Sequence, residues 1–146
     1  NWIYTRIFAN GEELDLAKCK VEDFYRELDM KRGIVTRTFK WNGLKFTFER
    51  FISMTAREIA AQKIEIESLG FEGEIKITAG SDFTPFHEEE NRNFWHEVYK
   101  ADAVIAACTE SSGQRVYSEF KANMTPDRYF TEEKKSCAEY SLAFKE

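Results

Sequence analysis

The sequence is poor in cysteine and in long hydrophobic runs, and both shortages limit the class of protein that it can encode. Its 146 residues include three cysteines, Cys19, Cys108 and Cys137, an odd number at wide spacing. This usage fits a reducing compartment better than a disulfide framework, so we expect a cytoplasmic location. The longest uninterrupted apolar run is Ala103 to Cys108, whereas a membrane-spanning helix needs about 20 residues. We therefore expect no membrane partner.

The sequence also lacks the short motifs of common catalytic and metal sites. It has no Gly-x-Ser-x-Gly nucleophile elbow, no glycine-rich phosphate loop and no Cys-x-x-Cys pair. The two histidines, His87 and His96, have no cysteine or carboxylate at a metal-binding spacing, so we expect neither a metal nor a cofactor. The net charge is −5 and the basic residues are dispersed among acidic ones, which argues against a nucleic-acid partner.

What the sequence does contain is a strong hairpin pattern in its first third. Two runs, Ile34 to Trp41 and Leu44 to Phe51, flank the dipeptide Asn42-Gly43, which tolerates the positive φ angles of a tight type I′ turn. Apolar and polar residues alternate along the second run, so one face is expected to be buried and the other solvated. The alternation slips near the end of this run, which predicts a bulge near Arg50.

Most of the remaining chain also has strand-like patterns separated by turn residues. This rhythm predicts an all-β fold, an antiparallel β-sandwich, over one domain of residues 1–146. The predicted strands are Trp2 to Phe8, Leu14 to Leu16, Val21 to Asp29, Thr55 to Ser68, Glu74 to Ala79, Trp95 to Thr109, Gln114 to Met124 and Ala138 to Phe144.

The run Thr55 to Ser68 is ambiguous, because its residues also have good helix propensity. Read with a period of two, however, the run from Ala60 onward separates into a less polar and a charged set. We prefer a strand and expect it to pair with Glu74 to Ala79 through a turn over Leu69 to Gly73.

Several segments of the chain resemble the amino-terminal domain of glycoside hydrolase family 65, whose members include maltose, kojibiose and trehalose phosphorylases. The main likeness is LDMKRGIVTRTFKW (residues 28–41), followed by ERFISM (49–54) and IAA (59–61). Asn1-Trp2, NGEELDL (10–16) and ACTESSGQRV (107–116) also fall in the order seen in that family. The likeness weakens after about Met124. Thr38 stands where relatives often have serine, and Glu58 where many have histidine, so no role of that histidine is carried over.

The resemblance implies a domain of the super-sandwich, galactose-mutarotase-like type, incomplete at both ends, as a fragment of a larger multidomain enzyme. In that family a helical linker, an (α/α)₆ barrel and a small β domain follow the sandwich. The barrel supplies the general acid, a glutamate that protonates the departing glycosidic oxygen while inorganic phosphate attacks the anomeric carbon with inversion. A hydrolytic member would also need a base to activate water. We therefore expect no catalytic residue in this chain.

The same resemblance implies the partners. They are an α-glucoside disaccharide in the parent enzyme, inorganic phosphate as a co-substrate if that enzyme is a phosphorylase, the catalytic barrel itself, and a second copy in a homodimer. Two alternatives remain open: a stand-alone carbohydrate-binding module, and a purely structural or dimerising sandwich.

For contact with sugar, the sequence offers aromatic rings and one loop histidine. Aromatic faces can stack on sugar rings, although most aromatic residues of a sandwich fill its core. The aromatic candidates are Trp41, Trp95, Tyr99, Tyr117 and Tyr129. We select Trp41, beside the hairpin turn, His87, in the long polar loop Gly80 to Asn93, and Trp95, just after that loop, because binding residues concentrate at strand ends and loops.

Overall fold

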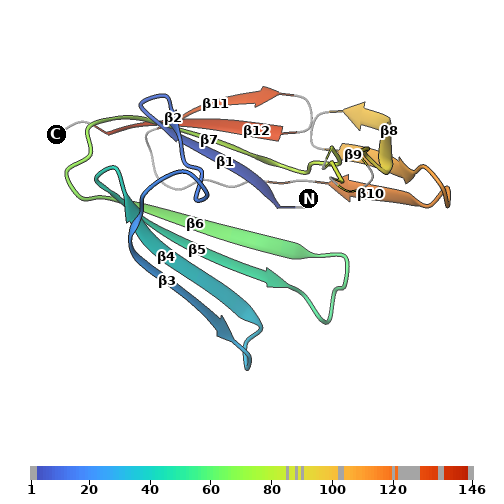
Figure 1. Cartoon of the computed structure of the whole chain (residues 1–146), viewed down its shortest axis with the longest axis horizontal. Helices are drawn as coiled ribbons and strands as arrows, with labels where there is room; N and C mark the ends of the chain where they lie inside the picture. The colour runs from blue at the N-terminus through green and yellow to red at the C-terminus, as the bar shows by residue number, and fades with distance from the viewer. Residues whose placement is uncertain are drawn as a thin grey trace. The chain divides into compact units, whose positions relative to one another are not determined.

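The computed structural model shows a chain built from β-strands, with no helix among its described residues (Figure 1). It describes residues 3–84, 86–87, 89, 91–101, 104–119, 121, 129–134 and 137–144; for 97–98, 100–101 and everything from 129 onward, it describes the backbone alone. The strands are β1 (Tyr4–Ala9), β2 (Glu12–Glu13), β3 (Glu22–Asp29), β4 (Ile34–Trp41), β5 (Leu44–Ile52), β6 (Ala60–Ser68), β7 (Gly73–Gly80), β8 (Trp95–Ala101), β9 (Val104–Thr109), β10 (Arg115–Glu119), β11 (Tyr129–Lys134) and β12 (Cys137–Phe144).

The strands form three sheets. One has four strands in the order β3-β4-β5-β6, a second has three in the order β10-β9-β8, and a third has five in the order β11-β12-β7-β1-β2. The chain divides into two compact units, residues 9–74 with 144–146 and residues 1–8 with 75–143. The four-stranded sheet belongs to the first unit and the three-stranded sheet to the second.

The predicted hairpin is confirmed as β4 and β5. Asn42 and Gly43 have φ angles of 51° and 73°, as a type I′ turn requires. The predicted bulge near Arg50 is wrong, because β5 pairs with both neighbours without a register shift from Leu44 to Arg50. Arg50, rather than Phe51, continues the buried face, and Phe51 turns to the exposed one. The bulge of this sheet lies in β3, between Glu22 and Tyr25.

The run Thr55 to Ser68 forms strand β6 over Ala60–Ser68, as preferred, but its predicted partner is wrong. β6 pairs with β5, whereas β7 lies between β12 and β1 in the five-stranded sheet. The segment between β6 and β7 contains two glycines with positive φ angles, Gly70 at 101° and Gly73 at 140°. Glycine adopts such angles without a steric penalty, so the chain can change direction here instead of closing a hairpin.

Asn10 fastens the beginning of β7 to the turn after β1. Its side-chain amide donates to the Glu72 carbonyl at 3.1 Å, and its side-chain oxygen accepts from the Glu74 N–H at 2.9 Å. The Asn10 N–H also donates to the Glu74 carbonyl at 2.9 Å. Three hydrogen bonds from one turn residue thus hold β7 beside β1, which explains why β7 does not return to β6.

The core of the four-stranded sheet is aromatic. Phe39 and Phe46 face each other across β4 and β5 with ring centroids 5.3 Å apart, and Phe48 lies 5.9 Å from Phe39. Ring pairs at such distances stabilise by about 0.5–1.5 kcal/mol beyond the burial of their area. All three rings are buried, together with Trp41 and Leu44.

The three-stranded sheet corrects another prediction. Trp95 to Thr109 is not one strand but the hairpin β8–β9, and β10 completes the sheet after the predicted turn at residues 110–113. One face of this sheet packs in a small cluster in which Ile105 and Ala107 meet Phe83, with Trp95 and Val116 against them.

Three further observations bear on the expectations from sequence. The short strand predicted at Leu14 to Leu16 is wrong, because β2 ends at Glu13 and residues 14–16 form no strand. β11 falls in a stretch for which no strand was predicted. Cys19 and Cys108 are free thiols. The described residues include no helix with the length and apolar character of a membrane span.

Candidate functional site

Trp41, the first predicted site residue, lies in the core at the end of β4. Its ring packs at 6.3 Å from that of Phe46, and the residue is 7% exposed. An open hollow of about 650 Å³ lies beside it. The hollow is lined by Glu12, Glu13, Asp15, Lys18, Cys19, Lys20, Trp41 and Asn42. Trp41 therefore offers this hollow little of its surface.

Two of the charged residues that line this hollow, Asp15 and Lys18, form an ion pair. Lys18 Nζ lies 2.9 Å from Asp15 Oδ2, and the Ala17 N–H donates to Asp15 Oδ1 at 2.9 Å. The hydrogen bond from Lys18, with that from Ala17, lowers the pKa of Asp15. A general acid for glycoside cleavage needs a raised pKa, so Asp15 is unsuited to protonating a glycosidic oxygen.

His87, the second predicted residue, is exposed in the loop between β7 and β8. Its N–H donates to the Arg92 carbonyl at 2.9 Å, and its ring meets the edge of Phe94 at 5.4 Å. Arg92 in turn lies 4.7 Å from the Phe94 ring and pairs with Glu110 at 3.3 Å. These contacts tie the loop to the turn between β9 and β10, so His87 is a fixed surface histidine.

Trp95, the third, belongs to the core cluster of the three-stranded sheet. It is half-buried, and its ring meets Phe83 edge-on at 5.4 Å. The rings of the three predicted residues thus contact three different phenylalanines, and Trp41 lies in a different unit from the other two. Their part in sugar binding stays a prediction.

An exposed pair of tyrosines, not among those three, is the clearest aromatic feature of the surface. Tyr99 on β8 and Tyr117 on β10 are both paired with Ala106 on the central strand β9, so they flank it on the same face. They are 57% and 71% exposed, whereas Ala106 between them is 4% exposed. Two strand spacings separate the tyrosine backbones, or about 10 Å. The sequence did not show that the two tyrosines share a face, because only the register of the three strands brings them together.

Asp29, like Asp15, is a carboxylate that its neighbours keep ionised. The pKa of Asp29 is lowered by hydrogen bonds from the Arg32 side chain and N–H. Others pair with lysines in the open, as Glu67 does with Lys45 at 3.0 Å and Glu65 with Lys63 at 2.6 Å. In the part of the chain that the structure covers, no three His, Cys, Asp or Glu side chains gather as a metal site would require.

The strand order and the aromatic cores define the class of this protein: it is an all-β protein of antiparallel sheets. The chain belongs to the family described as glycosyl hydrolase family 65, N-terminal domain, whose sequence model matches residues 1–145. The resemblance seen in the sequence is therefore confirmed.

Relatives and a solved structure agree with this assignment. An α,α-trehalose phosphorylase of Thermoanaerobacter brockii is 30% identical over 82 residues, which cover 53% of this chain and 11% of that protein. A maltose phosphorylase of Bacillus subtilis is 29% identical over 106 residues, 68% of this chain and 14% of that protein. A solved structure from the human microbiome, provisionally named a kojibiose phosphorylase, is similar to this chain, with a TM-score of 0.74 and 26% sequence identity. The match covers 99% of this chain and 22% of that protein.

Two conclusions follow from these comparisons. The predicted fold class, an antiparallel β-sandwich fragment, is confirmed by the solved neighbour. The chain spans only about a tenth to a fifth of the length of the proteins that it matches.

Proposed function

We propose that this chain is a non-catalytic amino-terminal domain that supports the catalytic barrel of a family 65 phosphorylase or hydrolase acting on α-linked glucose disaccharides. The observation that carries the proposal is the family match over residues 1–145. Further support comes from Asp15 and Asp29, whose lowered pKa values do not suit a general acid. In this role the domain packs on the barrel, borders the mouth of its active site and contributes to a dimer.

The substrate remains a choice among disaccharides. The matched relatives are named for trehalose, maltose and kojibiose, each made of two glucose units, and their identities to this chain are similar. With inorganic phosphate as co-substrate, the barrel needs only a general acid, because phosphate is already anionic; with water it also needs a base. Neither requirement falls on the described residues of this chain.

The 146-residue chain by itself is expected to give no phosphorolysis of maltose, kojibiose or trehalose and no hydrolysis of them. The reason is that the general acid lies in the barrel under this proposal. Release of glucose 1-phosphate and of glucose measures the two reactions, with a family 65 phosphorylase as positive control. Turnover by the purified chain above the rate of a heat-unfolded sample would contradict the proposal.

The second candidate function, a carbohydrate-binding module, is supported by Tyr99 and Tyr117. Exposed tyrosines on one face of a sheet offer apolar ring surfaces and hydroxyl groups at low cost in conformational entropy. Two strand spacings separate the two tyrosines by about 10 Å. This distance is about the length of two sugar units in an oligosaccharide. This candidate places the sugar on the three-stranded sheet instead of at Trp41 or Trp95.

If this module exists, Tyr117→Ala is expected to weaken binding of maltose or a longer α-glucan by roughly tenfold, or about 1.4 kcal/mol. Tyr99→Ala should act similarly, since both rings would contact the ligand. Tyr25→Ala is the matched control, because Tyr25 is 54% exposed but lies on the four-stranded sheet. Isothermal titration calorimetry measures the affinities. Equal losses in all three variants, or no binding by the unmodified chain, would rule the module out.

A further inference from the structure

Toward one end, the face of the four-stranded sheet that also holds the buried rings Phe39, Phe46 and Phe48 carries three arginines and no acidic residue. Direct cross-strand pairing places Arg26 of β3 opposite Arg37 of β4, and Arg37 opposite Phe48 of β5. Arg50 lies two residues beyond Phe48 on β5, so it shares this face with them. The opposite face, in contrast, carries the acidic residues of these strands, among them Glu27, Asp29, Glu49, Glu65 and Glu67.

The side chain of Arg37 is held in place by rings rather than by acids. Its guanidinium lies 4.6 Å from the centroid of Phe48 and 5.7 Å from that of Phe39. Its Nε is buried and has no hydrogen-bond acceptor among the described residues. Arg50 Nε donates to the neutral Gln62 side chain at 2.5 Å. A buried donor without an acceptor costs stability unless something else satisfies it.

The three positive charges are also uncompensated. Within the described part of the chain, no carboxylate pairs with Arg26, Arg37 or Arg50, although Arg32, Lys40, Lys45 and Lys63 all have acidic partners. Burial lowers the pKa of Arg37, and the charges of Arg50 and Arg26 lower it further. Burial, with the charge of Arg26, also lowers the pKa of Arg50. The isolated chain therefore keeps together three like charges that repel one another.

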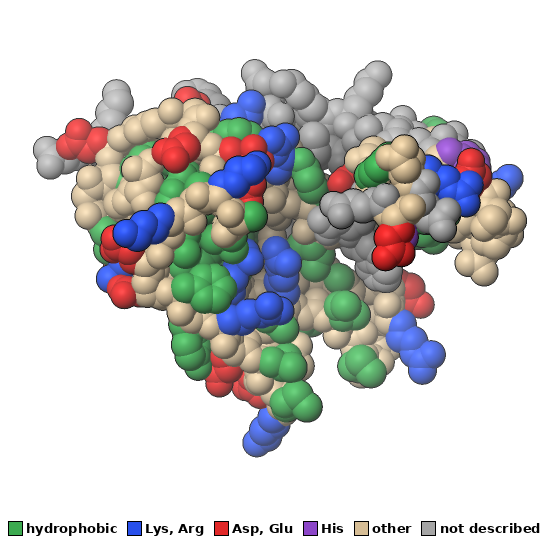
Figure 2. All heavy atoms as spheres, viewed as in Figure 1, with side chains coloured by type: hydrophobic (Ala, Val, Ile, Leu, Met, Phe, Trp, Pro, Cys, Tyr) green, Lys and Arg blue, Asp and Glu red, His purple; other side chains and the backbone are tan. Residues whose placement is uncertain are grey.

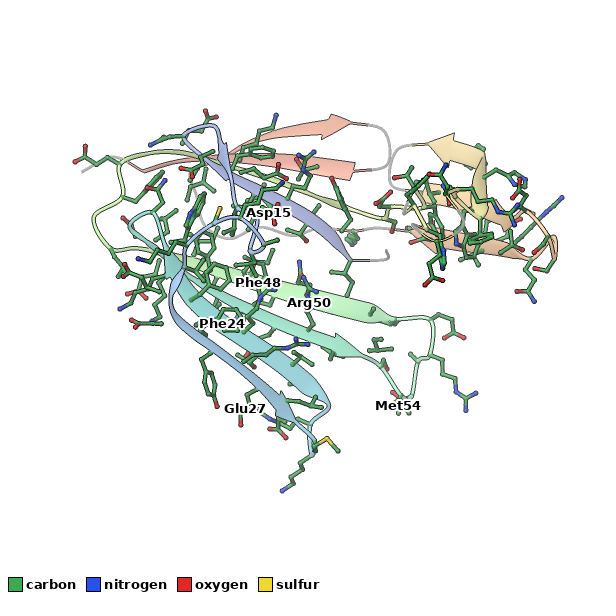
Figure 3. The ribbon with its side chains drawn as sticks, in the orientation of Figure 1. Asp15, Phe24, Glu27, Phe48, Arg50 and Met54 are labelled. Carbon is green, nitrogen blue, oxygen red and sulfur yellow. The ribbon has the colours of Figure 1, made fainter. Side chains whose placement is uncertain are left out.

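Exposed apolar side chains surround these arginines. Leu28 of β3 is 54% exposed on the same face, and Ile52 at the end of β5 is 60% exposed. Phe24, 51% exposed, reaches this face from the bulge of β3, where its ring stacks on Phe39 at 6.3 Å. Met30 and Met54, in the turns at that end of the sheet, are 84% and 87% exposed. Figure 2 shows basic side chains among hydrophobic ones over this sheet, and Figure 3 shows Phe24, Phe48 and Arg50 on it, with Met54 at the end of the loop. Arginine, aromatic residues and methionine are the types enriched in protein interfaces.

We infer that this surface, the arginine face (Phe24, Arg26, Leu28, Arg37, Arg50 and Ile52), docks on a protein surface that presents carboxylates among apolar side chains. The carboxylates would neutralise the three guanidinium groups, and the apolar contacts would cover the exposed rim. The inference rests on the proposed function for its partner, which is the catalytic part of the same longer protein. We choose this partner because acidic groups would complement the three arginines. The solved neighbour also shows that a longer chain can supply such a partner, since this chain covers only 22% of it.

The test compares modification of arginines by phenylglyoxal in the 146-residue chain and in the longer protein that the proposed function requires. In the longer protein, Arg26, Arg37 and Arg50 are expected to react at least about tenfold more slowly, because a desolvated ion pair blocks the reagent. Arg115, exposed on β10, is the internal reference and should change less. Peptide mass spectrometry measures each rate.

The other outcomes overturn the inference. Unchanged rates would show that nothing covers the arginine face. Protection of the short chain that rises with its own concentration, together with sedimentation as a dimer, would make the occupant a second copy. Protection of the short chain by inorganic phosphate alone would make it a small oxyanion. Activity assayed on the same longer protein separates the two proposals: reactive arginines in an active enzyme refute only the docking, and protected arginines in an inactive protein refute only the proposed function.

Stability supplies a second readout, with opposite signs in the two proteins. Arg37→Met keeps an apolar stem against Phe48 and removes one of three repelling charges, so it should raise the unfolding midpoint of the short chain by roughly 2 °C. In the longer protein the same change should lower the midpoint, because the partner carboxylates lose their counterion. Lys45→Met is the control, since its charge is paired with Glu67 on the opposite face. A fall in both proteins would mean that Arg37 is merely structural and would overturn the docking.

Discussion

Replacing Phe46 with alanine is expected to lower the free energy of unfolding by about 3–5 kcal/mol, the cost of deleting a fully buried aromatic ring. Phe46 is 0% exposed. It lies on the central strand β5, opposite Phe39 of β4 and Ile66 of β6. Its ring stacks at 5.3 Å on Phe39 and at 6.3 Å on Phe48. The surrounding rings cannot all move to fill the space, so a cavity remains. Urea denaturation followed by circular dichroism measures the loss.

Phe51→Ala is the matched control for this effect. Phe51 is the same residue type on the same strand, but it lies on the opposite face and is 43% exposed. We expect a smaller loss, about 1–2 kcal/mol, because much of the Phe51 ring is already in water and less apolar area is buried by it on folding. Equal losses for the two variants would contradict the assignment of faces in the four-stranded sheet.

Gly73→Ala is expected to cost about 3 kcal/mol, the second largest effect. Gly73 has a φ of 140°, where a side chain adds about 1–3 kcal/mol of strain. An added Cβ would also overlap the side-chain oxygen of Asn10. That oxygen accepts from the Glu74 N–H at 2.9 Å, and displacing the amide would weaken its bond to the Glu72 carbonyl too. Each lost bond adds about 1 kcal/mol.

Gly33→Ala separates the strain from the overlap. Gly33 also has a positive φ, 68°, but no atom lies within 4 Å of the position that its Cβ would take. We expect a loss of about 1 kcal/mol, the cost of the left-handed backbone alone. If thermal and urea unfolding gave the same loss for both variants, the role of Asn10 in fastening β7 would be refuted.

Local patterns predicted most of the elements of this fold. The turn at Asn42-Gly43 needs only two adjacent residues that accept a positive φ, and the alternation in β5 and β6 needs only period-two patterning. The errors lie where a choice depended on partners distant in the sequence. The bulge near Arg50 was predicted because Phe51 falls out of phase with Phe48, yet β5 stays in register and the stem of Arg50 lies on the buried face.

The candidate site was harder to predict from the sequence than the fold. Trp41 and Trp95 were chosen as aromatic residues near turns, and the structure places the first in a core and the second against one. A sequence does not tell which aromatic ring is covered, because burial depends on the sheet that packs over it. Tyr99 and Tyr117, 18 positions apart, reach one face only through their shared partner Ala106.

The sequence by itself determined most of the strands, the tight turn and the family, because these depend on patterns over a few neighbouring residues and on motifs such as residues 28–41. Only the tertiary structure decided that β7 leaves β6 for β1, that two tyrosines share a face, and that three arginines gather without an acid. The physical reason is that strand pairing joins residues far apart in the chain. Which side chains meet depends on a register that hydrogen bonds set across the sheet.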